Sequence, residues 1–500
     1  MSRPHLGIIV AALVLSLAAC SDASPPADSG QDARGEAVGI DGGGGDSKPG
    51  DADAAPDASV VQPCPTTLDE SAVNPAGGTA KALWLKTLAV GVTADYDGAS
   101  GGGGTFYLGG TLSAGGGTVN ATFGGKPVTV NQLQGFVALL DASGAVQQVL
   151  TATPLKMQLA ADADGVYAIF GWVSGDVTVG TSTASAVAGK RSLVVARITK
   201  AGAVSWVKAF GSSTKGARKQ YFGIDGAQRL HVAELHDEKV SFGGSEIDCD
   251  VSQLVIDKAG AIAHSRCITK ARGSIISLEG FAVDAAGDVT VGGFPGASYD
   301  LGFGVRTIDA STGGSVIVKV AYDGTPKWEQ RSTGAYLRVR GALSGDRVVV
   351  VGHVPQWGAR SFALAGDQFP DNCSGAFDRH ISVLDANGKR LSTVMHGGTL
   401  DNVFVGAQDS LLLVLQPTAP FLPGNAATRY SAARVDGSKL SWLQDIEQSG
   451  ATSFAMTARS ADETGRMLLA GFIKGRLAID KGDVVDHGTN TGDFVLLIGP

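Results

Sequence analysis

The chain has 500 residues and a formal net charge of −8 at pH 7, and it combines 71 glycines with only 18% charged residues. So much glycine argues against a helical protein, because each glycine in a helix interior costs about 1 kcal/mol relative to alanine. Collagen is excluded because glycine does not recur at every third position. The acidic balance excludes a typical nucleic-acid-binding protein, which is basic. Short strands joined by tight turns fit best, since such turns need residues that adopt positive φ angles.

Residues 1–20 are predicted to be a secretion signal. Arg3 precedes an uncharged run, Leu6–Ala19, which is shorter than the roughly 20 residues of a membrane span but suits a signal peptide. The ending Leu-Ala-Ala-Cys20 resembles the lipobox of bacterial lipoprotein signal peptides. That resemblance implies that Cys20 carries acyl chains, becomes the first mature residue and anchors the protein in the membrane. Ser21 in place of Asp favours the outer membrane. The alternative is an ordinary signal peptide with an incidental cysteine.

Residues 21–80 are predicted to be a disordered tether. They hold eleven acidic residues and two basic ones, with abundant Gly, Ala, Asp and Pro. Low hydrophobicity with one-sided charge is typical of disorder. The aspartates do not have the spacing of an EF-hand calcium loop, so we expect a solvated spacer. Residues 81–500 then carry 37 acidic and 37 basic side chains, so the acidity belongs to the tether.

From residue 81 the sequence repeats, with a strand that recurs at intervals of 56 to 64 residues. The seven copies begin with Phe106–Gly110, Val166–Gly171, Leu230–Leu235 and Val289–Phe294, and continue with Val348–His353, Leu411–Gln416 and Met467–Phe472. A second apolar strand follows each copy, as in Phe136–Gly144, and its first six copies end in a Gly-bearing turn. This pattern is typical of hairpins. A further strand precedes each copy, and an outer strand completes a unit of four.

The outer strand carries a tryptophan in four places, at Trp84, Trp206, Trp328 and Trp442. A large aromatic side chain at a fixed place in a repeat is expected to pack between neighbouring units rather than to form a ligand platform.

The two ends of the repetitive region complement each other. The last unit stops after its third strand, Phe494–Pro500, while Lys81–Leu88 is an outer strand without a unit of its own. Placing this strand beside the last unit closes a ring and protects the sheet edges. We therefore predict an all-β fold, a seven-bladed β-propeller of four-stranded blades, with residues 81–500 as one domain. An open β-solenoid is the alternative, but it leaves the first strand unexplained.

The repeat resembles the bacterial seven-bladed β-propeller repeat family over residues 81–500. The resemblance rests on the turn, the strand ending in Gly, the outer tryptophan and a Phe-Gly step at Phe123-Gly124, Phe242-Gly243 and Phe303-Gly304. The third, fifth and sixth units depart from the pattern, the fifth through an insertion at Trp357–Cys373. The resemblance implies an envelope protein of Gram-negative bacteria, of a family in which most members have no assigned activity.

The cysteines other than Cys20 suggest two disulfides in an oxidising compartment. Cys249 and Cys267 flank one hairpin, and antiparallel pairing places residue 252 opposite residue 267. A disulfide within the third unit is therefore expected. Cys64 and Cys373 would pair by elimination and fasten the tether to the propeller; the alternative is that both stay free.

The sequence contains no recognisable catalytic or cofactor motif. It has no HExxH or other zinc spacing, no GxSxG and no GxxxxGK[ST]. We predict no catalytic residue, no metal and no cofactor, and we read the histidines as surface or packing residues. Whether a pair of carboxylates suits glycoside chemistry depends on the distance between them.

Three functions stay open. We favour a lipid-anchored protein of the bacterial cell envelope, on the periplasmic face or the cell surface. Its propeller, which we expect to be monomeric, would bind or scaffold an unidentified protein or glycan partner and no nucleic acid. The main alternative is an enzyme, such as a glycan lyase or hydrolase or a quinone-dependent dehydrogenase, with its site at the channel mouth. A purely structural spacer is the third.

Overall fold

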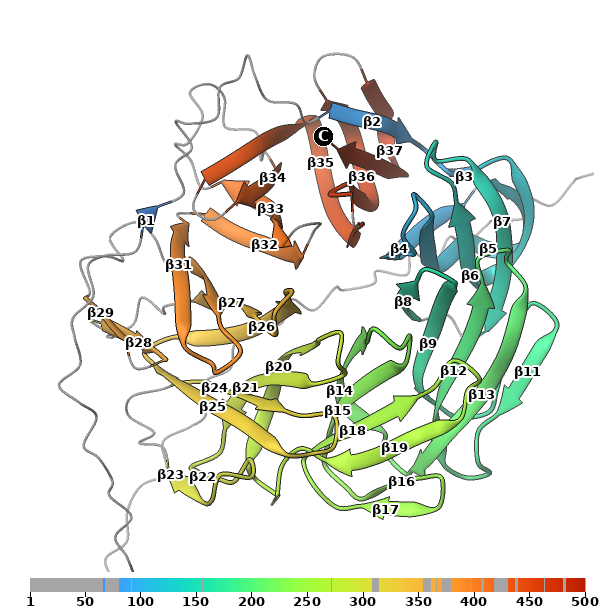
Figure 1. Ribbon diagram of the computed structural model, residues 1–500. Coiled ribbons are helices and arrows are strands. Elements are labelled where there is room, and N and C mark those ends of the chain that lie inside the picture. Colours follow the sequence, from blue (N-terminus) through green and yellow to red (C-terminus); the bar gives the residue numbers. More distant parts are fainter. Residues whose placement is uncertain are drawn as a thin grey trace, which may run out of the picture. The chain divides into compact units, whose positions relative to one another are not determined.

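The computed structural model describes residues 66–67, 81–90, 92–153, 157–270, 272–307, 314–353, 361–365, 367–370, 379–396, 398–405, 409–417, 430–436, 439–462, 464–479 and 483–499 (Figure 1). All of them belong to the unit Pro56–Pro500. Their regular structure is β-strand, apart from a single 3₁₀ position at Asp409. The expectation of an all-β chain is confirmed. Within this described part, no helix has the length and hydrophobicity that a membrane span needs.

The strands of the first three repeats form three sheets. The first sheet runs in the order β11 (Ser182–Ser185), β10 (Asp176–Val179), β7 (Val146–Thr153), β6 (Lys126–Leu140), β5 (Phe106–Phe123) and β3 (Ala89–Val90), with β4 (Thr93–Ser100) also on β5. The second runs β17 (Ser245–Ile247), β16 (Val240–Phe242), β13 (Val204–Ser213), β12 (Arg191–Thr199), β9 (Gly165–Val173) and β8 (Gln158–Asp162). The third runs β14 (Ala217–Ile224), β15 (Leu230–His236), β18 (Val251–Ile256) and β19 (Ile262–Cys267).

The later repeats form the remaining sheets. One runs β20 (Ile275–Val283), β21 (Val289–Pro295), β24 (Val316–Val320), β25 (Pro326–Thr333), β28 (Ser361–Leu364) and β29 (Asp367–Pro370). Another runs β1 (Thr66–Thr67), β31 (Arg390–His396), β30 (Arg379–Leu384), β27 (Val348–His353) and β26 (Tyr336–Ala342). The last runs β2 (Lys81–Lys86), β37 (Asp483–Gly499), β36 (Met467–Ile479), β35 (Lys439–Ala461), β34 (Tyr430–Asp436), β33 (Leu411–Pro417) and β32 (Gly398–Val405). A separate pair joins β22 (Ser298–Tyr299) to β23 (Arg306–Thr307).

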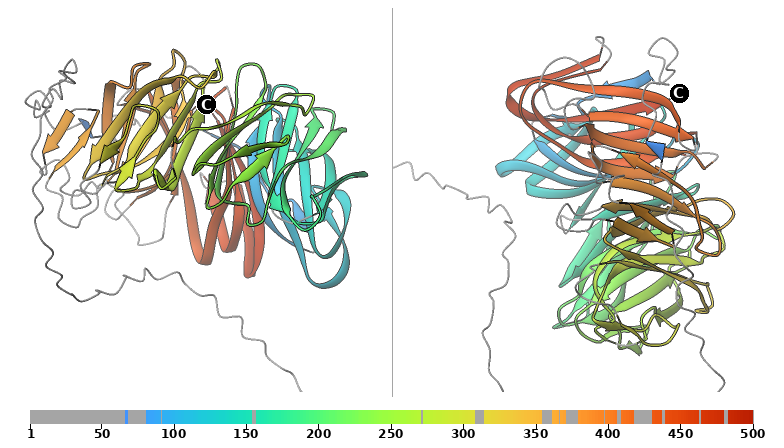
Figure 2. Two further views of the ribbon diagram at one scale, coloured as in Figure 1. Left: turned by 90° about the horizontal axis from the view of Figure 1, so that it is seen from below. Right: turned by 90° about the vertical axis from the view of Figure 1, so that its left-hand side faces the viewer.

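Each repeat is an up-and-down set of antiparallel strands whose two middle strands are buried on both faces. In the third sheet, for example, every residue of β15 and β18 is buried. This explains why these strands are continuous apolar runs in the sequence rather than alternating patterns. The cores lie between neighbouring sheets: one joins Tyr107 and Val137 of the first sheet to Val166 and Val194 of the second. Figure 2 shows neighbouring sheets standing face against face.

The first strands of successive repeats contact one another in a closed circuit. β4 contacts β8, and the series continues through β14, β20, β26 and β32 to β35, which contacts β4 again. The strand β2 pairs with β37, with Trp84 opposite Leu497, so residues from the two ends of the described region share a sheet. The arrangement is that of a propeller (Figure 1).

Three sheets contain more than the four strands expected because the hairpin between the second and third strands of a repeat is long. Its end, which we call the latch hairpin, pairs with the outer strand of the preceding repeat. Latch hairpins thus join β10 to β7, β16 to β13 and β28 to β25. The end of β5 reaches β3 in the same way, with Phe123 opposite Ala89. The Phe-Gly steps of the sequence lie at the tips of these long hairpins. In the β5–β6 turn, for example, Gly124 and Gly125 adopt φ angles of 54° and 80°.

The last large sheet contains two ladders that share one long strand. The first part of β35 pairs with β34, as in Arg434 opposite Trp442, and the second part pairs with β36, as in Ala461 opposite Met467. β35 is therefore the outer strand of one repeat and the inner strand of the next.

A short strand forms within the segment expected to be a tether. In β1, Thr66 and Thr67 pair in parallel with Val394 and Met395 of the outer strand β31. The other residues of the predicted signal and tether, 1–65 and 68–80, lie outside the described residues.

Candidate functional site

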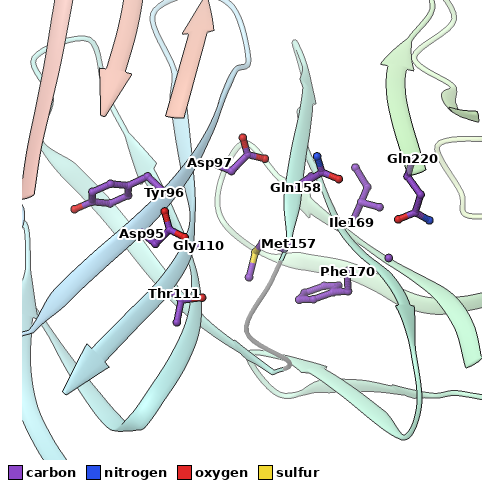
Figure 3. Close-up of a pocket in the computed structure, with 11 residues that line it drawn as sticks. Asp95, Tyr96, Asp97, Gly110, Thr111, Met157, Gln158, Ile169, Phe170 and Gln220 are labelled. Carbon is purple, nitrogen blue, oxygen red and sulfur yellow. The ribbon is translucent and has the colours of Figure 1, made fainter. Parts of the chain in front are cut away.

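A cavity of about 380 Å³ lies beside the inner strands β4, β8 and β14, within the size range of small-ligand sites (Figure 3). Three consecutive residues of β4 line it: Asp95, Tyr96 and Asp97. β5 and β9 contribute two short backbone segments, and Gln158 and Gln220 come from β8 and β14. The cavity is thus built by three successive repeats, at the inner side of the strand circuit.

Because side chains alternate along a strand, Tyr96 lies on one face of β4 and the two aspartates lie on the other. Tyr96 is buried, and its hydroxyl donates a hydrogen bond to Asp493 Oδ2 at 2.7 Å. In Figure 3 its ring points away from the cavity. Asp95 and Asp97, one residue to either side, lie on the other face of the strand. The cavity therefore receives both carboxylates.

Asp97 joins the first repeat to the second. Its two carboxylate oxygens accept backbone hydrogen bonds from Gly98 N at 2.9 Å and from Leu159 N, at the start of β8, at 2.7 Å. Burial raises the pKa of Asp97 to about 6, and the negative charge of Asp95 adds to the increase, although the two backbone donors oppose it. The carboxylate of Asp97 therefore links two repeats, and with a pKa of about 6 it takes up a proton just below neutral pH.

Asp95 differs from Asp97 because its side chain is exposed to solvent. Among the described residues, none donates a hydrogen bond to its carboxylate or forms an ion pair with it. It is the free anionic group of the cavity.

The wall opposite β4 combines an anchored amide with apolar side chains. Gln220 donates a hydrogen bond to the buried Glu234, which also accepts the indole N–H of Trp172 at 2.8 Å. The Oε1 atom of Gln220 lies over Gly171, so a Cβ added to Gly171 would come within 2.9 Å of that oxygen. The side chains of Met157, Ile169 and Phe170 are buried and make this part of the lining apolar.

The described lining of the cavity carries carboxylates, amides, hydroxyl groups and apolar side chains. None of the described residues that line the cavity is Ser, Cys, Lys or His, and both oxygens of Asp97 already accept backbone donors. The lining can recognise a ligand by charge, by amide hydrogen bonds and by apolar contact.

A group behind this wall contains the residue types of a catalytic triad but not its geometry. His236 Nε2 lies 3.0 Å from Ser252 Oγ and 3.3 Å from Glu234 Oε2. A triad needs the acid and the nucleophile on different nitrogens of the ring. All three side chains are also buried, so no substrate reaches them. The group is part of the core between the second and third sheets.

A second acidic group is partly neutralised by two lysines. The carboxylates of Asp284, Asp288 and Asp346 lie within 4.8 Å of one another. Lys319 Nζ is 2.8 Å from Asp284 Oδ2, and Lys327 pairs with Asp288. These ion pairs explain the clustering, and we assign no metal to it.

The tryptophans lie at contacts between neighbouring repeats. Trp84 and Trp328 are buried, and Trp206 is partly buried. Each indole N–H donates to a carbonyl in a turn of the next repeat: Trp84 to Ala142 at 3.1 Å, Trp206 to Lys258 at 3.0 Å and Trp328 to Ala386 at 2.8 Å. Each ring also covers the glycine of that turn, at Gly144, Gly260 and Gly388. The side chain of Trp442 lies outside the described residues, although its backbone belongs to β35.

Of the predicted cysteine sites, only one pair falls within the described residues. Cys249 and Cys267 lie beside each other, with their sulfur atoms 2.24 Å apart and their Cα atoms 5.9 Å apart, and the disulfide between them stays a prediction. Ser252 is the partner of Cys267 in the ladder, as expected. Cys20, Cys64 and Cys373 lie outside the described residues.

The residues of the cavity were not among the predicted site residues. Asp95 and Asp97 stand in the stretch Thr-Ala-Asp-Tyr-Asp-Gly, where two acidic residues alternate within an inner strand. A comparison of the inner strands with one another would have singled out these two aspartates. Gln220 has no such signal, because its place in the cavity depends on packing between repeats.

Comparisons with known proteins identify no family. No family model and no curated protein matches the chain. Among solved structures, it is similar to a protein of unknown function from Bacteroides caccae, with 12% identity and a TM-score of 0.30 over 62% of this chain and 89% of that one. It is also similar to a structure described as the Dos1 propeller, with 8% identity and a TM-score of 0.34 over 84% of this chain and 95% of that one.

Proposed function

We propose that this protein is a lipid-anchored binding module of a bacterial cell envelope. The observation that carries the proposed binding role is the cavity between β4, β8 and β14, which presents a free carboxylate, two amides and an apolar wall. Its partner is a protein or a glycan, and the ring acts as a monomer that holds this surface in a fixed geometry.

The propeller of this proposal has seven blades. The support is the circuit of inner strands β4, β8, β14, β20, β26, β32 and β35, one for each of the seven sequence repeats. In this count β2 supplies the outer strand of the seventh blade through its pairing with β37.

We propose that Cys20 carries the lipid anchor. The support for this is the sequence Leu-Ala-Ala-Cys alone. The outer membrane is the proposed destination. Growth with an alkyne-tagged fatty acid is expected to label the native chain and not Cys20→Ser. Labelling of that variant would refute the anchor. Membrane fractionation then tests the location.

Capture experiments test the binding role. The immobilised full chain should retain a component of envelope extracts, and Gln158→Trp, which fills the cavity from its exposed rim on β8, should lose it. Thr151→Trp is the matched control, because it adds the same bulk on the exposed outer strand β7. Equal retention by both variants would show that the cavity is not the site.

The second candidate is an envelope enzyme, such as a glycan lyase or hydrolase or a quinone-dependent dehydrogenase. The raised pKa of Asp97, about 6, favours it, since perturbed carboxyl groups in cavities are common in active sites. Turnover of envelope glycans that is lost in Asp95→Asn, with the folded state intact, would support this candidate. A binding signal without turnover supports the binding module.

A further inference from the structure

The cavity between β4, β8 and β14 contains negative charge that no cationic side chain of its described lining balances. Of the eleven lining residues in the described part of the chain, two are aspartates and none is Lys, Arg or His. The two carboxylates are close enough for the charge of Asp95 to disfavour ionisation of Asp97. A cation bound beside them would relieve this repulsion.

A second cavity shows that this charge is not a general property of the surface. It has a volume of about 610 Å³ and lies beside β2 and the β5–β6 and β6–β7 turns. Lys86 and Lys126 line it, and none of its described lining residues is Asp or Glu. The two cavities therefore have opposite charge, and only the first is suited to a cation.

The other wall of the first cavity indicates which kind of cation fits. Calcium takes six to eight oxygen ligands, and magnesium takes six in nearly ideal geometry. Here both oxygens of Asp97 accept backbone N–H groups, and Met157, Ile169 and Phe170 offer no oxygen from their side chains. Buried apolar side chains opposite a carboxylate match an organic cation with an aliphatic stem.

We propose that this cavity binds an alkylammonium group, as carried by a lysine side chain, with Asp95 as its ion-pair partner. The inference rests on the proposed binding role and specifies its ligand. The ammonium group lies at the Asp95 carboxylate, while the methylene stem contacts Met157 and Phe170. Asp97 contributes a second negative charge, but its fixed hydrogen bonds keep it in place between the first two repeats.

Calorimetry with the purified full chain and 1,5-diaminopentane tests this inference. The diamine should bind saturably at pH 7.5, whereas glutarate, a dianion with the same number of carbons, should not. Asp95→Asn keeps the shape of an exposed side chain and should weaken binding at least about tenfold, because the lost contact is a charge-assisted hydrogen bond. Asp176→Asn, at an exposed position on β10, is the matched control and should bind like the native chain.

The outcomes separate this inference from the proposed binding role. No diamine binding, or equal binding by Asp95→Asn and Asp176→Asn, overturns the inference even if Gln158→Trp abolishes capture of the envelope component. Diamine binding that Asp95→Asn weakens supports the inference even if capture does not depend on the cavity. Binding of calcium that displaces the diamine also overturns it, because the site would then be a metal site.

Discussion

Asp493 is the residue whose removal most directly tests how the ring is closed. Its carboxylate, on β37, is 2% exposed. Oδ2 accepts hydrogen bonds from Leu88 N at 2.8 Å, Ala89 N at 3.2 Å and the hydroxyl of Tyr96 at 2.7 Å. One atom of the last repeat thus holds both the link that follows β2 and the inner strand of the first repeat.

Asp493→Ala leaves these three donors without their acceptor. A hydrogen bond to a charged group contributes about 1.5–3 kcal/mol, and a buried donor left unpaired costs about 1–3 kcal/mol. The effects are not additive, and removing a carboxylate whose pKa burial has raised returns part of the desolvation cost. We therefore expect the free energy of unfolding to fall by about 3–5 kcal/mol. Tyr96→Phe removes one of the three bonds and should cost about 1.5 kcal/mol.

Urea denaturation followed by tryptophan fluorescence measures these losses. Asp486→Ala is the matched control, because Asp486 is an exposed aspartate on the same strand and its carboxylate accepts only the neighbouring Gly488 N–H in the described region. The double variant Asp493→Ala/Tyr96→Phe should lose less than the sum of the two single changes, since the hydroxyl has no acceptor left to lose. Hydrogen exchange should accelerate at the amides of residues 88 and 89. If Asp493→Ala unfolds as readily as Asp486→Ala does, the reasoning about ring closure is wrong.

Other positions give independent tests. Burial and the nearby Arg266 charge lower the pKa of His264 to about 4, so the unfolded chain takes up this proton first as the pH falls. The free energy of unfolding should therefore decrease between pH 6.5 and 4, with a shallower slope in His264→Gln when urea curves are compared. Gly388→Ala should destabilise more than Gly345→Ala: both glycines have positive φ (79° and 65°), but only the first Cβ would meet an indole, at 2.7 Å. Equal melting temperatures would contradict this packing. Replacing Cys249 and Cys267 together by Ser should cost about 2–4 kcal/mol, and reductant should lower the stability of the native chain but not of the variant.

The repeated strands could be predicted because their burial is determined locally. The runs Val166–Gly171 and Val348–His353 fall within β9 and β27, since a strand covered on both faces is apolar throughout and stands out in the sequence. The outer strand Lys81–Leu88 could be assigned to the last repeat by counting strands, and β2 does pair with β37.

The latch hairpins and the cavity could not be predicted in this way. The strand β16 of the third repeat pairs with β13 of the second at one position, where Ser241 lies opposite Ser212. Nothing in the Phe242-Gly243 step of the sequence indicates that β16 pairs with β13. Asp97 looks like any aspartate in a polar strand, yet its environment depends on Leu159 N in another repeat. These features depend on the positions of neighbouring sheets, which the sequence of one repeat does not contain.

The pairing of β2 with β37 has a consequence for the order of events during synthesis. β2 is made before every other strand from residue 81 onward, but its partner is made about 400 residues later, a delay of about 20–80 s at 5–20 residues per second. Throughout that interval the segment Lys-Ala-Leu-Trp-Leu-Lys is an apolar strand without a partner. The lysines at its two ends, Lys81 and Lys86, are the type of residue that discourages unwanted edge pairing. Their charge would protect the nascent chain until β37 arrives.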